Sequence, residues 1–107
     1  MSCRVKLTAT AKADLRSIAL YLAEQSKDKE VAARFVSELQ QTCNILEQFP
    51  ESGSIPKDRV LMSTGYRFLV HKEYLIFYSY EKAEETAYIL AIFNAKRDYM
   101  RVMKRFL

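Results

Sequence analysis

Positive charge is concentrated at the C-terminal end of this chain. The last twelve residues contain five Lys or Arg against one acid, so they carry as much charge as the net +4 of the whole chain. Such side chains bind phosphates and carboxylates, and the planar fork of Arg suits phosphate especially well. The segment is a candidate contact for a polyanion or an acidic protein, and an exposed helix face is the alternative. Its five bases are Lys96, Arg97, Arg101, Lys104 and Arg105.

The position of these residues separates them into two groups. Lys96 and Arg97 directly follow the last predicted strand, where they can meet other strand ends, so we expect them to be the functional pair. Arg101 and Lys104 fall three residues apart on a predicted final helix, and we expect them to give diffuse attraction to nucleic acid. Tyr99 lies within the basic segment and can stack on a base or donate to a phosphate, although packing of the helix onto the sheet also accounts for it.

Three further bases lie near the predicted sheet. Arg67 is set in the apolar stretch "GYRFLVHKEYLIFY", where a charged side chain needs a partner. A salt bridge to Asp or Glu satisfies this need, and so does a bound phosphate. If helices cover the face of Tyr66 and Phe68, Arg67 points from the open face. Lys57 and Arg59 of the preceding loop and the pair Lys96–Arg97 can then meet Arg67 there and form an anion site.

The remaining composition excludes several classes of protein. We find no Gly-rich phosphate loop, no Ser-His-Asp arrangement and no metal-ligand spacing, and the chain has one His and two Cys, so neither a metal nor a cofactor is expected. No apolar run approaches the roughly 18 residues of a membrane span, and the N-terminus lacks the apolar region of a signal peptide. These features predict one cytoplasmic domain spanning residues 1–107.

Hydrophobic periodicity predicts an α+β fold. Two amphipathic helices follow a short first strand, and the second ends at Pro50. We expect a helical hairpin packed on a small antiparallel sheet, in the order β-α-α-β-β-β with a short C-terminal helix. The predicted strands cover 5–7, 66–70, 74–80 and 86–93, with a short edge strand at 60–62. The predicted helix core is Leu15, Ile18, Leu22, Phe35, Leu39 and Leu46.

Four stretches of the chain resemble the RelE/ParE superfamily, the toxins of type II toxin-antitoxin modules. They are "LTATAKADLRSIALYLAEQ", "LEQFPESGS", "GYRFLVHKEYLIFYSYE" and "YILAIFNAKRDYMRV", and together they cover almost the whole chain in the family's order. The resemblance implies a growth-inhibiting toxin in one of two branches. RelE-like members are ribosome-dependent endoribonucleases that cut mRNA without a metal, whereas ParE-like members poison DNA gyrase by binding.

The resemblance also implies roles for individual residues. Arg67 matches the strand arginine that RelE-like enzymes place on the scissile phosphate, and Lys57 and Arg59 lie in the region of their basic loop. Lys96 or Arg97 matches the basic position after the last strand. Tyr99 is a looser match to a C-terminal tyrosine. In such an enzyme the 2′-OH of the RNA attacks the adjacent phosphate, and cations stabilise the developing charge.

Partners follow from the same resemblance. It implies a cognate antitoxin held with the toxin in a hetero-oligomer, with an amphipathic antitoxin segment along the sheet and the grooves beside the helical hairpin. It also implies either the ribosome and mRNA or DNA gyrase as the target. Three hypotheses remain open on the sequence: a ribonuclease, a gyrase poison that acts without catalysis, and an inactive remnant that binds only an antitoxin.

Overall fold

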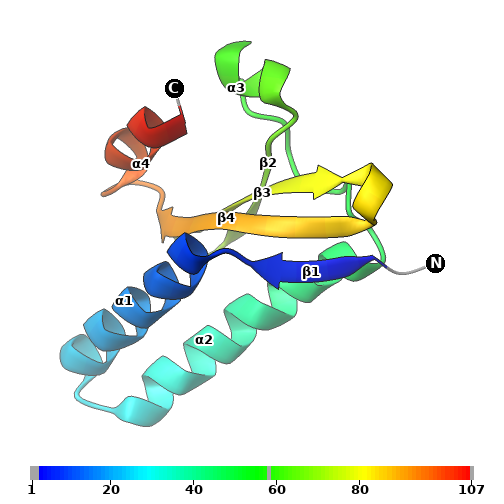
Figure 1. The fold of residues 1–107 in the computed structure, drawn as a ribbon. Coiled ribbons are helices and arrows are strands. Elements are labelled where there is room, and N and C mark those ends of the chain that lie inside the picture. Colours follow the sequence, from blue (N-terminus) through cyan, green and yellow to red (C-terminus); the bar gives the residue numbers. More distant parts are fainter. Residues whose placement is uncertain (1–2, 58, 107) are drawn as a thin grey trace.

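The computed structural model describes residues 3–57 and 59–106. Its element order confirms the predicted α+β fold, with the helical hairpin between the first and second strands and a short helix after the last (Figure 1). The elements are β1 (Arg4–Leu7), α1 (Ala9–Ser26), α2 (Lys29–Asn44), the 3₁₀ turn η1 (Ile45–Glu47), α3 (Arg59–Thr64), β2 (Arg67–His71), β3 (Tyr74–Glu81), the 3₁₀ turn η2 (Lys82–Glu84), β4 (Thr86–Asn94) and α4 (Tyr99–Phe106).

The helical hairpin is defined by caps that the sequence supplies. Thr8 accepts a hydrogen bond from the backbone N–H of Ala11 at 3.2 Å and so caps α1, and Asp28 caps α2 by accepting from Glu30 N–H at 2.9 Å. Between them, Lys27 adopts a left-handed conformation with φ 57° and turns the chain. The two helices therefore run antiparallel beneath one face of the sheet (Figure 1).

The sheet is mixed, which corrects the expectation of an antiparallel sheet. Strands β2, β3 and β4 form the predicted antiparallel meander, but β1 pairs in parallel with β4, from Arg4 opposite Thr86 to Leu7 opposite Ile89. Parallel neighbours require a long crossover connection, and the helical hairpin with the meander provides it. The short alternation of residues 5–7 fits either direction, so the sequence alone did not reveal the pairing.

The predicted edge strand at residues 60–62 is wrong, because this segment lies within helix α3. A run of three apolar residues is too short for its period to separate strand from helix. In Figure 1, α3 and α4 lie on the side of the sheet away from the helical hairpin.

Apolar side chains pack on both faces of the sheet. On the hairpin face, Leu15, Ile18, Leu39 and Leu46 are buried as predicted, and Leu22 and Phe35 are partly buried against them. On the outer face, Phe77, Ala91 and Phe93 form a smaller cluster with Val102 of α4. Both faces therefore contribute to stability, and the outer cluster holds α4 in place.

Two cysteines belong to this interior. Cys3 and Cys43 are buried free thiols, and burial raises the pKa of both, that of Cys43 to about 11. Thiols with raised pKa values are poor nucleophiles at neutral pH, so both act as packing residues. Among the described residues, no helix is long and apolar enough to cross a membrane.

Candidate functional site

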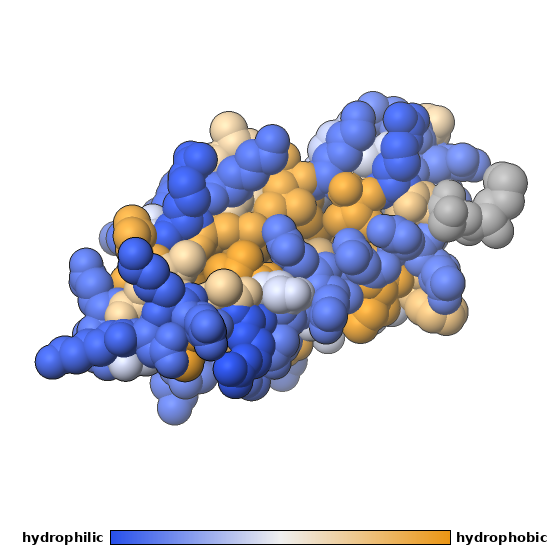
Figure 2. Space-filling view, turned by 90° about the horizontal axis from the view of Figure 1, so that it is seen from below, coloured by the Kyte–Doolittle hydropathy of each residue, from blue (hydrophilic) through white to orange (hydrophobic). Residues whose placement is uncertain are grey.

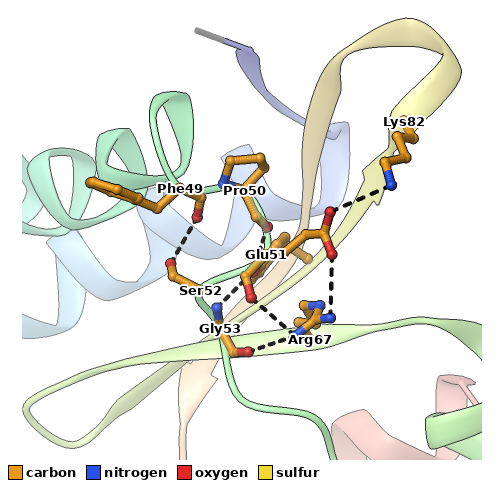
Figure 3. Close-up of polar contacts among 8 residues, drawn as sticks. Phe49, Pro50, Glu51, Ser52, Gly53, Arg67 and Lys82 are labelled. Carbon is orange, nitrogen blue, oxygen red and sulfur yellow. Dashed lines mark hydrogen bonds and ion pairs between the residues drawn. The ribbon is translucent and has the colours of Figure 1, made fainter. Parts of the chain in front are cut away.

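Arg67 is held in a network that fixes the loop after the second helix. Its Nη1 donates to the carbonyl oxygens of Glu51 and Gly53, each at 3.1 Å, and its Nη2 lies 3.8 Å from the Glu51 carboxylate (Figure 3). The Tyr78 hydroxyl completes the network by donating to Pro50 O at 2.8 Å and accepting from Gly53 N–H at 3.0 Å. Both Nη1 donors of Arg67 are thus directed at loop carbonyl oxygens, and Nη2 faces the Glu51 carboxylate.

The direction of Arg67 corrects the expectation that it points from the open face of the sheet. Leu69 and His71, which share its face of β2, contact the hairpin side: Leu69 packs on the hairpin-face cluster, and His71 Nδ1 lies 3.0 Å from Thr42 Oγ1 of α2. Both faces of β2 carry apolar residues, so its pattern did not show which face the helices cover. The alternative of a salt bridge finds its partner in Glu51 at 3.8 Å, while the hydrogen bonds of Arg67 go to loop carbonyl oxygens. The catalytic role of Arg67 stays a prediction.

We expect Arg67→Ala to lower the free energy of unfolding by about 1–2 kcal/mol, because it leaves two carbonyl oxygens without their donor. The side chain is 25% exposed, so water replaces part of what is lost. Urea unfolding followed by circular dichroism measures the change. Glu51→Gln is the matched control and should cost less than about 0.5 kcal/mol, since the Glu51 side chain is mostly exposed. Equal stability of Arg67→Ala and the wild type would contradict a structural role.

Lys96 and Arg97 lie in a turn that buried Asn94 organises. The Asn94 Oδ1 accepts hydrogen bonds from the backbone N–H groups of Lys96 at 3.0 Å and Arg97 at 2.9 Å. The Arg97 guanidinium lies over the ring of Tyr21 in α1, 4.6 Å from its centroid, which is a cation–π contact. Arg97 therefore bridges the end of β4 and the helical hairpin.

Strand register separates Arg97 from Arg67. Tyr74 pairs with both His71 and Asn94, whereas Arg67 pairs with Tyr78, four residues further along β3. Four residues span about 13 Å in a strand. The structure thus places the Lys96–Arg97 turn and Arg67 at opposite ends of the meander, and it does not bring them together around one phosphate.

Two cavities of about 300 and 490 Å³ adjoin Arg97 and share Tyr21, Tyr74 and Asn94 in their walls. Burial raises the pKa of the Tyr74 hydroxyl, against the opposing effect of Arg97, so this phenol stays protonated and can donate. Asp14 lines the smaller cavity, and its carboxylate accepts from Ile92 N–H at 2.9 Å. Burial raises the pKa of Asp14 as well. Carboxylates of Asp14 and Asp98 line the smaller cavity and that of Glu73 lines the larger one, so both cavities carry charge of both signs beside Arg97.

Lys57 and Tyr99 meet elsewhere, on the outer face of the sheet. Both line a pocket of about 380 Å³ whose remaining walls are Ser54, Ile55, Pro56, Phe68, Leu75 and Phe77. We name this the outer-face pocket. The sequence indicated Lys57 as a candidate nucleic-acid-binding residue and Tyr99 as a candidate catalytic one, and both roles stay predictions. It did not indicate the apolar residues that line the pocket between them. The apolar pair Ile55-Pro56 directly before Lys57 was the available signal.

The other predicted binding residues lie at the surface. Arg59 begins α3 and is exposed. On α4, Arg101 pairs with Asp98 at 3.3 Å, and Lys104 is exposed. Val102, between them, is buried. This placement fits a solvated basic helix face whose charges act at a distance.

Comparisons with known proteins define the class. The family model for the ParE toxin of type II toxin-antitoxin systems matches residues 5–99. A chain of the chromosomal ParDE system from P. aeruginosa is 21% identical with a TM-score of 0.72, covering 87% of this chain and 96% of that one. A chain of the RelBE2 complex from Mycobacterium tuberculosis is 19% identical with a TM-score of 0.67, covering 88% and 92%. A mutant E. coli RelE toxin in the free state is 12% identical with a TM-score of 0.63 over both full chains.

The fold is thus that of the RelE/ParE superfamily of type II toxins. Since the family model covers most of its length, this chain belongs to the ParE toxin family. No curated protein matches the sequence.

Proposed function

We propose that this toxin arrests growth by binding a target protein, with DNA gyrase as the candidate, and that it does not cleave RNA. The observation that carries the proposal is the separation of the basic residues. Arg67 is held by loop carbonyl oxygens, Arg97 stacks on Tyr21 at the other end of the meander, and Lys57 lines the outer face.

Cleavage of RNA by its own 2′-OH needs several groups around one phosphate. A base must remove the hydroxyl proton, cations must stabilise the pentacovalent phosphorus, and an acid must protonate the leaving oxygen. Each group must lie within hydrogen-bond reach, about 3 Å, of its atom. The arrangement of Arg67, Arg97 and Lys57 disfavours such a centre and leaves binding as the better account.

We also propose a cognate antitoxin as partner in a hetero-oligomer. Viewed from the side of the helical hairpin, the molecule carries an apolar band between charged flanks (Figure 2). A groove of about 460 Å³ between α1 and α2 is lined by Leu7, Leu15, Ala19 and Val36 with Lys12 and Arg16 among them. An amphipathic segment with acidic residues fits such a surface. Two of the structural relatives come from toxin-antitoxin systems.

Parallel assays with the purified toxin test the proposed function. We expect the protein to inhibit supercoiling by DNA gyrase, to leave mRNA intact in a translating extract, and to lose its effect on gyrase when pre-mixed with its antitoxin. Arg97→Ala serves as a second probe. If Arg97 were catalytic, its removal would lower the rate of mRNA cleavage about 10²–10³-fold. Cleavage of mRNA by the wild type that Arg97→Ala abolishes would establish the ribonuclease instead.

A further inference from the structure

The outer-face pocket is a built cavity with fixed walls. Its floor comes from strands β2 and β3, one wall from the loop at residues 54–57, and the other from Tyr99 at the start of α4. Backbone hydrogen bonds join Ser54 to Phe68 in both directions at 2.9 Å and fix the loop on β2. Burial of Val102 in the outer cluster fixes α4. The walls are therefore in place before any partner arrives.

Its chemistry is mostly apolar with one cation. Ile55, Pro56, Phe68, Leu75 and Phe77 line it, and Lys57 supplies the charge. Among the described residues, no carboxylate lines the pocket. A volume of about 380 Å³ lies within the usual range of about 300–1,000 Å³ for ligand pockets. Such a pocket removes an apolar group from water and offers one carboxylate a partner at its rim.

We propose that the outer-face pocket receives an apolar side chain of the target protein, with a neighbouring carboxylate of the same target paired to Lys57. This inference rests on the proposed function and names the contact through which it acts. Central apolar pockets that bury one partner side chain supply much of the affinity of protein interfaces. Lys104 and Arg105 in the last turn of the adjacent α4 add positive charge, which favours an acidic partner surface.

RNA fits the same pocket less well. A base can stack on the Tyr99 ring, but proteins that bind single-stranded nucleic acid combine such stacking with a positively charged groove that follows the backbone. Lys57 is the charged residue in the lining, and Arg67 is engaged on the hairpin face. An apolar anchor beside a carboxylate uses the whole pocket, whereas a nucleotide leaves most of its apolar lining without a matching group.

Substitutions at the pocket and matched controls test the inference against purified DNA gyrase. Tyr99→Ala removes a wall, and Lys57→Glu reverses the rim charge. Met100→Ala is the control for Tyr99→Ala, because Met100 is the next residue of α4, is 69% exposed and lies outside the pocket lining. Lys29→Glu is the control for Lys57→Glu, because it makes the same charge change at an exposed residue of α2. We expect the two pocket variants to need at least about tenfold more protein for half-inhibition of supercoiling. Both controls should stay within about twofold of the wild type.

Two further readouts keep the outcome clear. Thermal unfolding of each variant should match the wild type, and if Tyr99→Ala loses stability, Ile55→Ala replaces it, because Ile55 is an exposed loop residue. The effect of Lys57→Glu should shrink as the salt concentration rises.

If the wild type inhibits gyrase and both pocket variants inhibit it equally well, the pocket inference is overturned and the proposed function stands. If the wild type has no effect on gyrase, the proposed function fails. If the pocket variants reduce binding of a single-stranded RNA oligonucleotide, the pocket serves RNA and the inference is overturned.

Discussion

Leu39→Ala should lower the free energy of unfolding by about 2–5 kcal/mol, the usual cost of truncating a large side chain in a packed core. Leu39 of α2 is 0% exposed and belongs to the cluster between the helical hairpin and the sheet. The substitution leaves a cavity that the rigid helix pair cannot close. Urea unfolding at equilibrium, followed by far-ultraviolet circular dichroism, measures the loss.

Leu20→Ala is the matched control for this prediction. Leu20 lies on α1 and is 66% exposed, so the same chemical truncation removes little buried surface and should change stability by less than about 0.5 kcal/mol. A cost at Leu39 no larger than the cost at Leu20 would mean that the hairpin does not pack on the sheet as described.

Gly53→Ala should cost about 2–3 kcal/mol, because its new methyl group meets an immovable neighbour. A Cβ built at Gly53 lies 2.6 Å from both Cε1 and the hydroxyl oxygen of Tyr78. Tyr78 is fully buried and hydrogen-bonded to the loop on both sides of its hydroxyl. The ring cannot yield without losing these hydrogen bonds, so we expect a lower midpoint in thermal unfolding.

Gly65→Ala separates this clash from the ordinary cost of replacing glycine. Gly65 has φ 81° and no atom within 4 Å of a built Cβ, so its substitution costs only backbone strain of about 1 kcal/mol. The double variant Gly53→Ala/Tyr78→Phe should lose less stability than the sum of the losses in the two single variants, because both substitutions act on one contact. If Gly53→Ala is no worse than Gly65→Ala, the loop shifts freely and Tyr78 does not fix it.

Much of the fold followed from local patterns. The 3.6-residue spacing through Leu15, Ile18 and Leu39 predicted both long helices, and the apolar runs joined by short polar connections predicted the meander. Two features did not follow. The parallel pairing of β1 depends on a strand about eighty residues away, and α3 has too few residues for a readable period.

The candidate site was harder to predict than the fold. The sequence identified Arg67 as a charged residue in need of a partner, but its partners are backbone carbonyl oxygens of a loop that no side-chain pattern reveals. The sequence indicated no role for Tyr21, although its ring makes a cation–π contact with Arg97, which lies far away in the sequence. Lys57 and Tyr99 share a pocket because of strand register and the position of α4. Such contacts depend on three-dimensional geometry, which periodicity does not encode.

The parallel pairing of β1 with β4 has a consequence for the order in which the protein is made. The helical hairpin and the β2–β3 pair rest on contacts between near neighbours, and such local contacts form early because little loop entropy opposes them. The pairing of Arg4 with Thr86 instead has to wait until the ribosome has synthesised the last strand. During synthesis the first strand therefore stays without its partner, and the four-stranded sheet closes only after β4 has been made. A toxin with this topology therefore acquires its complete sheet, and the surface that the sheet supports, only after its helical hairpin.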